Sequence, residues 1–227
     1  MPRTTPLRTI AALSICLAAI GSAHATTNLV TNGSMTGPAM IGSPPPAWAS
    51  LSTDGDTIPV GGLSGWAPGI GASPDGDTFL ALLNNGGGGS YDAVSQSISG
   101  FSAGQTYTLE FYYTNAGLSP SLASNYANPG DIRASIGGNT FDSPTLANDG
   151  FGNQQWFDYK TTFVATAGTL TLTLAAVREG DAIGGYAGGI DGVSISATTV
   201  PEPSGVALML AGIGALGWRV RRTARQA

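Results

Sequence analysis

Apolar and polar residues alternate through the middle of the chain. The clearest example is residues 169–174, in which three threonines alternate with three leucines. A period of two places the leucines on one face of a strand and the threonines on the other. Residues 106–113 alternate in the same way, with Tyr, Leu, Phe and Tyr on one face. Both segments therefore predict strands with one buried side and one side that faces solvent.

Four further segments have the same character and predict strands over 93–99, 132–136, 156–165 and 189–197. The 34 glycines and 14 prolines provide many tight turns between short strands and leave little room for long amphipathic helices. Half-buried antiparallel strands assemble as two packed sheets. We therefore expect an all-β fold, an antiparallel β-sandwich over residues 26–199, a length that suits one domain.

Longer apolar runs lie at the two ends of the chain. Near the N-terminus, two arginines precede the apolar run 10–20, and Ala23 and Ala25 are the small residues that a signal peptidase reads. We expect residues 1–25 to form a signal helix that is removed after Ala25. A buried N-terminal helix is the alternative.

The C-terminal end has three parts in a fixed order. Pro201, Glu202 and Pro203 come first, the Gly-rich apolar run 204–218 follows, and four arginines come last. An apolar helix of this length, at ~1.5 Å per residue, nearly crosses a ~30 Å hydrocarbon layer. Basic residues stay on the cytoplasmic side, which places the preceding domain outside the membrane. The arginines that we expect to hold this end are Arg219, Arg221 and Arg222.

This order of parts over residues 200–227 resembles the PEP-CTERM sorting tail, which exosortases process in Gram-negative bacteria. The resemblance implies that signal peptidase and an exosortase act on the chain during export. It also implies a short-lived inner-membrane intermediate, cleavage near the Pro-Glu-Pro, and release to the cell envelope or the extracellular polymer matrix. A permanent C-terminal membrane anchor is the alternative.

Composition narrows the chemistry that is available after processing. Cys16 and His24 are the only cysteine and histidine, and both lie in the expected signal segment. The mature chain would then have no disulfide, no Cys or His nucleophile and no zinc site of the usual kind. Between residues 26 and 200, three basic residues stand against thirteen acidic ones, a formal charge of −10. Such a surface repels phosphate backbones, so we expect no nucleic-acid partner.

Six short motifs fall in the order seen in galactose-binding-like jelly rolls. They are residues 28–34, 63–66, 74–82, 94–98, 103–111 and 189–195. The resemblance implies a jelly-roll domain of the kind common among secreted carbohydrate-binding modules and envelope proteins. It therefore implies a binding or structural role more than catalysis, although a fold does not identify a ligand.

In many such domains a structural calcium ion ties the first strand to the last. The resemblance makes Asp191 the aspartate of the final Ile-Asp motif, whereas Thr36 stands where an early acid is usual. Calcium takes about six to eight oxygen ligands, and backbone carbonyls near Asn32 would supply some of them. Asp191 and Asn32 are thus candidate metal-binding residues. The alternative is that Asp191 caps a turn.

Aromatic residues on loops are candidate contacts for sugars, because a ring face can stack on a sugar ring. We expect Trp48 or Trp66 to contact a glycan. Four tyrosines lie on further segments that we expect to be exposed: Tyr91, Tyr112, Tyr126 and Tyr186.

Catalysis on polysaccharides has a weaker basis in the sequence. A glycosidase needs two carboxyl groups that face each other. The only glutamates between residues 26 and 200 are Glu110, on the polar face of a predicted strand, and Glu179, in a predicted turn. The sequence therefore predicts a non-enzymatic adhesion or scaffolding protein of the envelope or biofilm matrix. The alternatives are a module that binds the cell's own exopolysaccharide and, third, a polysaccharide-active enzyme.

Overall fold

Ten strands form in the described part of the chain between residues 49 and 197. The computed structural model describes residues 27–52, 55–63, 69–84, 91–117, 128–147, 155–178, 185–198 and 213. The chain divides into two units, and the unit Thr26–Thr198 contains all of these strands. They are β1 (Ala49–Ser50), β2 (Asp56–Pro59), β3 (Thr78–Asn84), β4 (Ala93–Ser99), β5 (Thr106–Asn115), β6 (Gly130–Ile136), β7 (Asn139–Asp142), β8 (Phe157–Val164), β9 (Thr169–Arg178) and β10 (Tyr186–Ala197).

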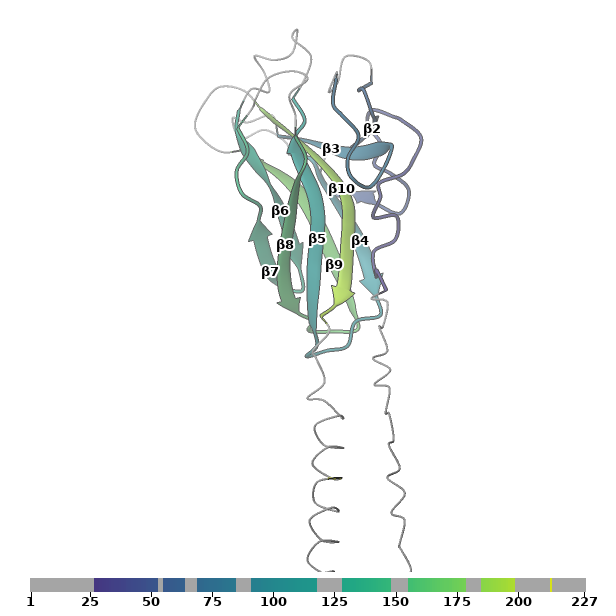
Figure 1. Cartoon of the computed structure of the whole chain (residues 1–227), viewed down its shortest axis with the longest axis vertical. Helices are drawn as coiled ribbons and strands as arrows, with labels where there is room; N and C mark the ends of the chain where they lie inside the picture. The colour runs from purple at the N-terminus through teal and green to yellow at the C-terminus, as the bar shows by residue number, and fades with distance from the viewer. Residues whose placement is uncertain are drawn as a thin grey trace, which may run out of the picture. The chain divides into compact units, whose positions relative to one another are not determined.

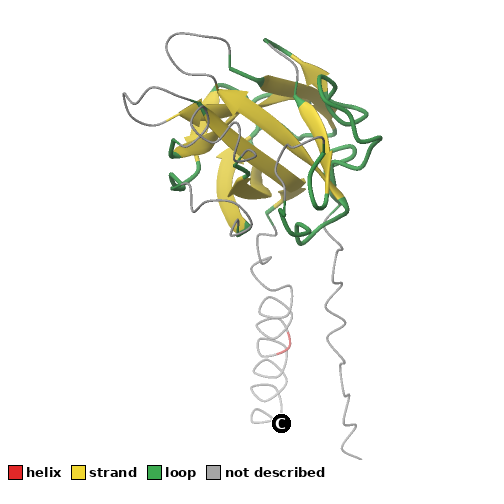
Figure 2. Ribbon diagram, turned by 90° about the horizontal axis from the view of Figure 1, so that it is seen from above, coloured by secondary structure: helices red, strands yellow, loops and turns green. Residues whose placement is uncertain are grey.

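The strands build two five-stranded sheets that face each other (Figures 1 and 2). We call the sheet with the order β1-β4-β9-β6-β7 the β9 sheet, and the sheet with the order β2-β3-β10-β5-β8 the β10 sheet. Every pair of neighbouring strands is antiparallel. The predicted all-β, antiparallel two-sheet architecture is therefore confirmed.

The predicted alternation of β9 decides which side of its sheet is buried. Leu172 and Leu174 are fully buried between the sheets, whereas Thr171 points outward and is exposed. β5 alternates in the same way from the opposite sheet, with Leu109 and Phe111 in the core. Each such side chain contributes ~1.5–3 kcal/mol of transfer free energy when it is fully buried. The core between the sheets therefore rests on the period-two pattern of the sequence.

β3 breaks this pattern because both of its faces are buried. Leu80 and Leu82 enter the main core, while Phe79 and Ala81 face a second, smaller cluster on the outer side of the β10 sheet. The Trp156 ring packs edge-to-face on Phe79, with the ring centroids 5.4 Å apart. A strand that is covered on both sides reads as a continuous apolar run instead of an alternating one.

The first described residues pair with the last strand. The Leu29 amide donates to the Ile195 carbonyl at 2.9 Å, and the Val193 amide donates to the Gly33 carbonyl at 2.8 Å. The Asn28 side-chain oxygen accepts a hydrogen bond from the Ile195 amide at 3.0 Å. These bonds attach the N-terminal segment of the domain to β10.

The predicted segments at the two ends lie outside the described residues. These are the signal helix 1–25 and the apolar run 204–218, of which only Ile213 is described. Within the described part of the chain, no helix has the length and hydropathy of a membrane span.

Replacing Gly33 by alanine should destabilise the domain. A Cβ atom at this position would lie 1.9 Å from the Val193 carbonyl oxygen. This oxygen belongs to the backbone of β10, so it cannot move away without disturbing the pairing of the N-terminal segment with that strand. We expect the free energy of unfolding to fall by ~1–3 kcal/mol, as in other overpacked sites. Urea denaturation measures the change.

The matched control is Gly71→Ala, because a Cβ at Gly71 would meet no atom within 4 Å. Equal stability of the two variants would contradict the close packing of Gly33 on β10.

Candidate functional site

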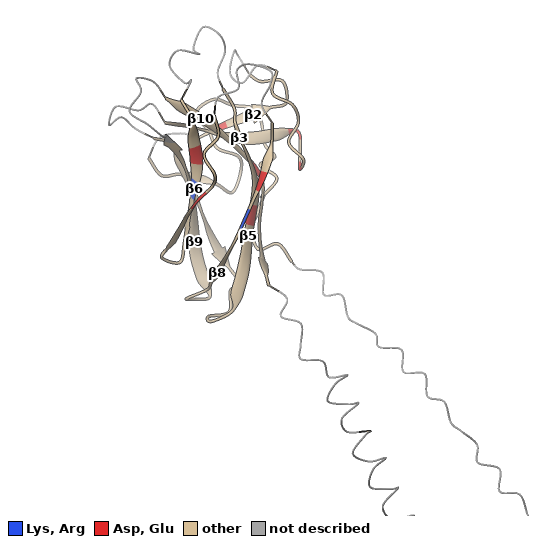
Figure 3. Cartoon of the chain, turned by 60° about the vertical axis from the view of Figure 1, so that its left-hand side comes forward, with Lys and Arg blue, Asp and Glu red and all other residues tan. Residues whose placement is uncertain are grey.

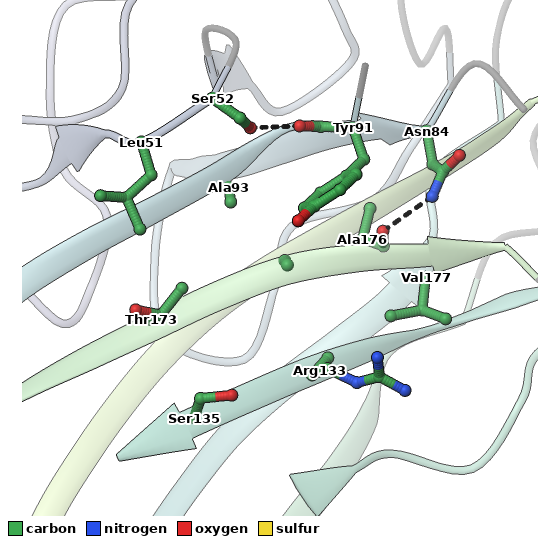
Figure 4. A pocket seen from close by; sticks show the side chains of 11 residues that line it. Leu51, Ser52, Asn84, Tyr91, Ala93, Arg133, Ser135, Thr173, Ala176 and Val177 are labelled. Atoms are coloured by element: carbon green, nitrogen blue, oxygen red, sulfur yellow. Dashed lines mark hydrogen bonds between the residues drawn. The ribbon is translucent and has the colours of Figure 1, made fainter. Parts of the chain in front are cut away.

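A groove of about 460 Å³ lies on the outer face of the β9 sheet (Figure 4). Its volume falls in the range of ~300–1,000 Å³ that is usual for small-molecule sites. The residues that line it are Leu51, Ser52, Asn84, Tyr91, Ala93, Arg133, Ser135, Thr173, Ala175, Ala176 and Val177.

Strand register explains why the sheet is hollowed at this point. Ala93 on β4 lies opposite Ala175 on β9, so two of the smallest side chains meet at the centre of the groove. Larger side chains stand around this floor. Tyr91 is 50% exposed and Leu51 is 56% exposed, and both project from segments that flank β4. The groove is thus a floor of small residues beside an aromatic and an aliphatic side chain.

Arg133 brings a positioned cation to the groove from β6. Its Nε donates to Asp142 Oδ1 at 2.7 Å, and a terminal guanidinium nitrogen donates to Asp142 Oδ2 at 2.9 Å. The hydrogen bond from Arg133 holds the pKa of the Asp142 carboxyl below its usual value. This two-pronged contact fixes the plane of the guanidinium group, which a single point contact would not do.

Other polar groups of the groove are held by the backbone. The Asn84 side-chain amide donates to the Ala176 carbonyl at 3.0 Å, and the Ser52 hydroxyl donates to the Tyr91 carbonyl (Figure 4). Ser135 and Thr173 add hydroxyl groups from neighbouring strands. One exposed aromatic ring with several fixed hydrogen-bonding groups is an arrangement that suits a sugar.

Carboxyl groups are absent from the described residues that line the groove. Glu110 lies on the other sheet, where it pairs with Lys160 at 3.3 Å. Glu179 lies outside the described residues. The described residues that line the groove therefore do not supply the two facing carboxyl groups that glycoside hydrolysis uses.

Asp191 lies elsewhere, at an irregularity in the pairing of β10 with β5 between residues 191 and 194. Its side chain is fully buried. One carboxylate oxygen accepts a hydrogen bond from the Ser73 hydroxyl, and the other accepts one from the Gly192 amide at 2.8 Å. Burial, with a smaller effect from the charge of Asp75, raises the pKa of Asp191 to about 6 against the two hydrogen bonds.

The surroundings of Asp191 fit a calcium ion in part. Asp191 Oδ2 and the Ser34 carbonyl oxygen lie 3.8 and 3.5 Å from the point where a Cβ of Gly76 would stand. Oxygens from the first turn and the last strand thus converge beside a residue that lacks a side chain, as a linking ion would require. No group of three or more His, Cys, Asp or Glu side chains gathers around a common point in the described part of the chain.

Asn32, the second candidate metal-binding residue, already supports a turn. Its Oδ1 accepts the Thr36 amide at 3.1 Å, and its carbonyl accepts the Trp48 indole at 3.1 Å. The carbonyl of Ser34, which lies beside Gly76 as Asp191 Oδ2 does, is a further candidate ligand, and a calcium site here stays a prediction.

The aromatic candidates have different positions from those expected. Trp48 is only 6% exposed and belongs to the main core, which corrects the expectation that its ring is available to a glycan. Tyr186 is fully buried, and burial raises the pKa of its hydroxyl well above the usual value. Tyr112 is half-buried, while Trp66 and Tyr126 lie outside the described residues. Among these candidates, the structure brings Tyr91 to the groove.

Sequence reasoning missed Arg133, Asn84 and the alanine floor. They come from four strands, β3, β4, β6 and β9, whose order in the sheets does not follow the sequence. No local motif marks these residues. The strand register shows that Ala93, Ala175 and Arg133 are neighbours, and Asn84 joins them from the other sheet.

Calcium should raise the melting temperature of the exported protein, if the ion binds between Ser34 and Asp191. A ligand that binds only the folded state stabilises it by mass action. We expect a higher melting temperature in millimolar calcium than in EDTA, and no response in Asp191→Asn. An unchanged melt of the unaltered protein in both solutions would leave Asp191 as a turn residue.

In EDTA, the stability should also depend on pH through Asp191. Its folded pKa of about 6 lies above the unfolded value of ~3.9, so the folded state binds more protons between these values. The contribution of Asp191 to the free energy of unfolding is then fully present below the unfolded pKa and is lost as the pH rises through about 6. Urea titrations at several pH values measure this loss, and Asp191→Asn should lack it.

Three comparisons set this chain against known proteins, and the first two compare sequences. The PEP-CTERM protein-sorting motif matches residues 199–222. Among curated proteins, no sequence matches this chain.

Three of the solved structures that match this chain are sugar-bound or sugar-binding proteins. An arabinose-bound α-L-arabinofuranosidase, MgGH51, is 11% identical with a TM-score of 0.51, over 76% of this chain and 27% of that chain. TmCBM61, in complex with β-1,4-galactotriose, is 12% identical with a TM-score of 0.46, over 76% of this chain and 100% of that chain. The xylan-binding domain from Paenibacillus barcinonensis is 14% identical with a TM-score of 0.42, over 79% of this chain and 99% of that chain.

The match to the arabinofuranosidase, at 11% identity and a TM-score of 0.51, indicates a shared fold and nothing more. The sorting motif is the specific result, because it covers the same C-terminal parts that the sequence pattern singled out and implies export. The chain therefore carries a PEP-CTERM protein-sorting motif that follows an antiparallel two-sheet domain in the sequence.

Proposed function

We propose that the exported domain binds an extracellular polysaccharide in the groove of the β9 sheet and acts there as a non-enzymatic adhesion protein. The observation that carries the proposal is the half-exposed ring of Tyr91 beside the floor formed by Ala93 and Ala175. A ring face stacks on the apolar face of a sugar, and the small floor gives the sugar room to approach.

Hydrogen-bonding groups around the ring support the same reading. Arg133 supplies a guanidinium group, and Ser135 and Thr173 supply hydroxyls. Sugar hydroxyls both donate and accept, so a mixture of fixed donors and hydroxyls can satisfy them when water is displaced. Hydrolysis would need two facing carboxyl groups. The described residues that line the groove include none.

Delivery to the envelope or polymer matrix completes the proposal. Residues 1–25 act as the signal peptide, and residues 26–199 form the jelly-roll domain. The tail 200–227 holds the chain transiently in the inner membrane, where an exosortase processes it. The match of the sorting motif to residues 199–222 supports this route. Scaffolding then follows from binding, because a protein that holds the cell's own exopolysaccharide adheres to the matrix.

Tyr91→Ala should weaken polysaccharide binding. Loss of one stacked ring should raise the dissociation constant by about tenfold, equivalent to ~1.4 kcal/mol. An array of neutral and acidic polysaccharides, probed with the exported protein and the variant, identifies the polymer, and titration calorimetry measures its affinity.

The control is Phe157→Ala, which removes a ring that is 41% exposed on the other sheet. The groove would be ruled out if both variants bound as tightly as the unaltered protein. Binding to no polymer in the array would count against polysaccharide binding itself.

Processing gives a separate prediction. The released protein should begin at Thr26 and lack the segment from Ser204 onward, because both ends carry cleavage signals. Intact mass spectrometry of extracellular material tests this expectation. Recovery of a species that retains Trp218 and the terminal arginines would contradict sorting by the tail.

A further inference from the structure

The outer face of the β9 sheet continues beyond the groove as an ordered array of small hydroxyl side chains. Register places eight of them on this face, and we call them the hydroxyl rows. They are Ser95, Ser97 and Ser99 on β4, Thr169, Thr171 and Thr173 on β9, Ser135 on β6 and Thr140 on β7.

The rows run across the sheet. The first joins four strands, since Thr173 lies opposite both Ser95 and Ser135, and Ser135 lies opposite Thr140. The hydroxyls of Ser135 and Thr140 are 3.3 Å apart. The second row pairs Ser97 with Thr171. Strands lie ~4.8 Å apart and successive rows ~6.7 Å apart, so the hydroxyls form a regular lattice.

This lattice is open to solvent and continuous with the groove. Ser97, Thr169 and Thr171 are all exposed. Ser135 and Thr173 line the groove and also belong to the first row. From Tyr91 to Ser99 the strand advances by eight residues, which corresponds to a path of ~26 Å along the face.

Few of the described charged side chains point outward from the β9 sheet. The described charged side chains that point outward from the β9 sheet are the ion pair of Arg133 with Asp142 and the buried Asp131. The outer face of the β10 sheet carries Glu110 and Lys160 on neighbouring strands (Figure 3). The hydroxyl rows are therefore neutral, on a segment of the chain, 26–200, with a formal charge of −10.

We propose that the hydroxyl rows extend the groove and hold one neutral, extended polysaccharide chain that runs along β9 from Tyr91 toward Ser99. This inference rests on the proposed function of the groove. A regular series of hydroxyls can exchange hydrogen bonds with the repeating hydroxyls of a neutral polymer. An anionic polymer is disfavoured, because the net negative charge of the segment 26–200 repels it.

The experiment compares chain lengths and variants of the exported protein. The probes are β-1,4-linked glucan, galactan and xylan oligosaccharides from disaccharide to hexasaccharide, with polygalacturonate as the anionic polymer. The double variant Ser97→Ala/Thr171→Val removes two hydroxyls of the second row and keeps the size of the β-branched side chain. Thr162→Val is the matched control, because Thr162 is an exposed threonine on the outer face of the β10 sheet.

We expect the affinity for one of the neutral series to rise with chain length. The double variant should lower the hexasaccharide affinity by about tenfold through the loss of two hydrogen bonds and leave the disaccharide affinity unchanged. Thr162→Val should change neither. Tyr91→Ala should weaken binding of every length, which separates the groove from the rows.

Three results would overturn the inference. The first is equal affinity for disaccharide and hexasaccharide, which would confine the ligand to the groove and leave the proposed function intact. The second is tighter binding of polygalacturonate than of every neutral series. The third is a change of oligomeric state in the double variant by sedimentation, which would make the rows a contact between copies of the chain. If the affinity of the unaltered protein does not depend on chain length and Tyr91→Ala abolishes binding, the results support the proposed function alone.

Discussion

The register of β9 between β4 and β6 links the core to the binding face. Leu172 and Leu174 are fully buried between the sheets, and the threonines that alternate with them must point outward. A slip of one residue would turn the leucines to solvent and the threonines into the core. Burial of the leucines, at ~1.5–3 kcal/mol each, therefore also determines where the hydroxyls and the groove lie. The same interaction that stabilises the sandwich arranges the surface that we assign to polysaccharide.

A second constraint acts where the chain enters and leaves the sandwich. Asp191 is a fully buried acid in β10, and its hydrogen bonds come from the Ser73 hydroxyl and the Gly192 amide. Burial of a carboxyl group favours its neutral form, in agreement with the raised pKa of Asp191. The tight contact of Gly33 with Val193 brings the first turn to the same strand. The N-terminal segment and the last strand thus depend on each other at one place.

Sequence patterns predicted the parts of this structure in which one physical rule dominates. Strands with one wet face, such as β5 and β9, follow from alternation alone. β3 was not among the predicted strands because Phe79 and Ala81 are covered by a second cluster, so its apolar run has no period of two. Trp48 was expected at the surface because composition carries no information on burial, and its indole instead ties the core to a turn. The groove needs register as well as composition, since most of its lining residues come from strands that are neighbours only in space.

The ion pair of Arg133 with Asp142 illustrates how stability and function separate on this face. Both side chains are nearly half-exposed, at 46% and 43%, so the pair contributes at most ~1 kcal/mol to folding. Such a small contribution to the free energy of folding does not explain why Arg133, the only arginine among the groove residues, lies beside the alanine floor. Its geometry is the stronger reason. Two parallel hydrogen bonds orient the guanidinium plane at the edge of the groove, and the Asp142 carboxylate that accepts them offsets its positive charge. The pair thus provides a rigid, directional group on a neutral surface, which suits uncharged sugar hydroxyls better than it suits a carboxylate.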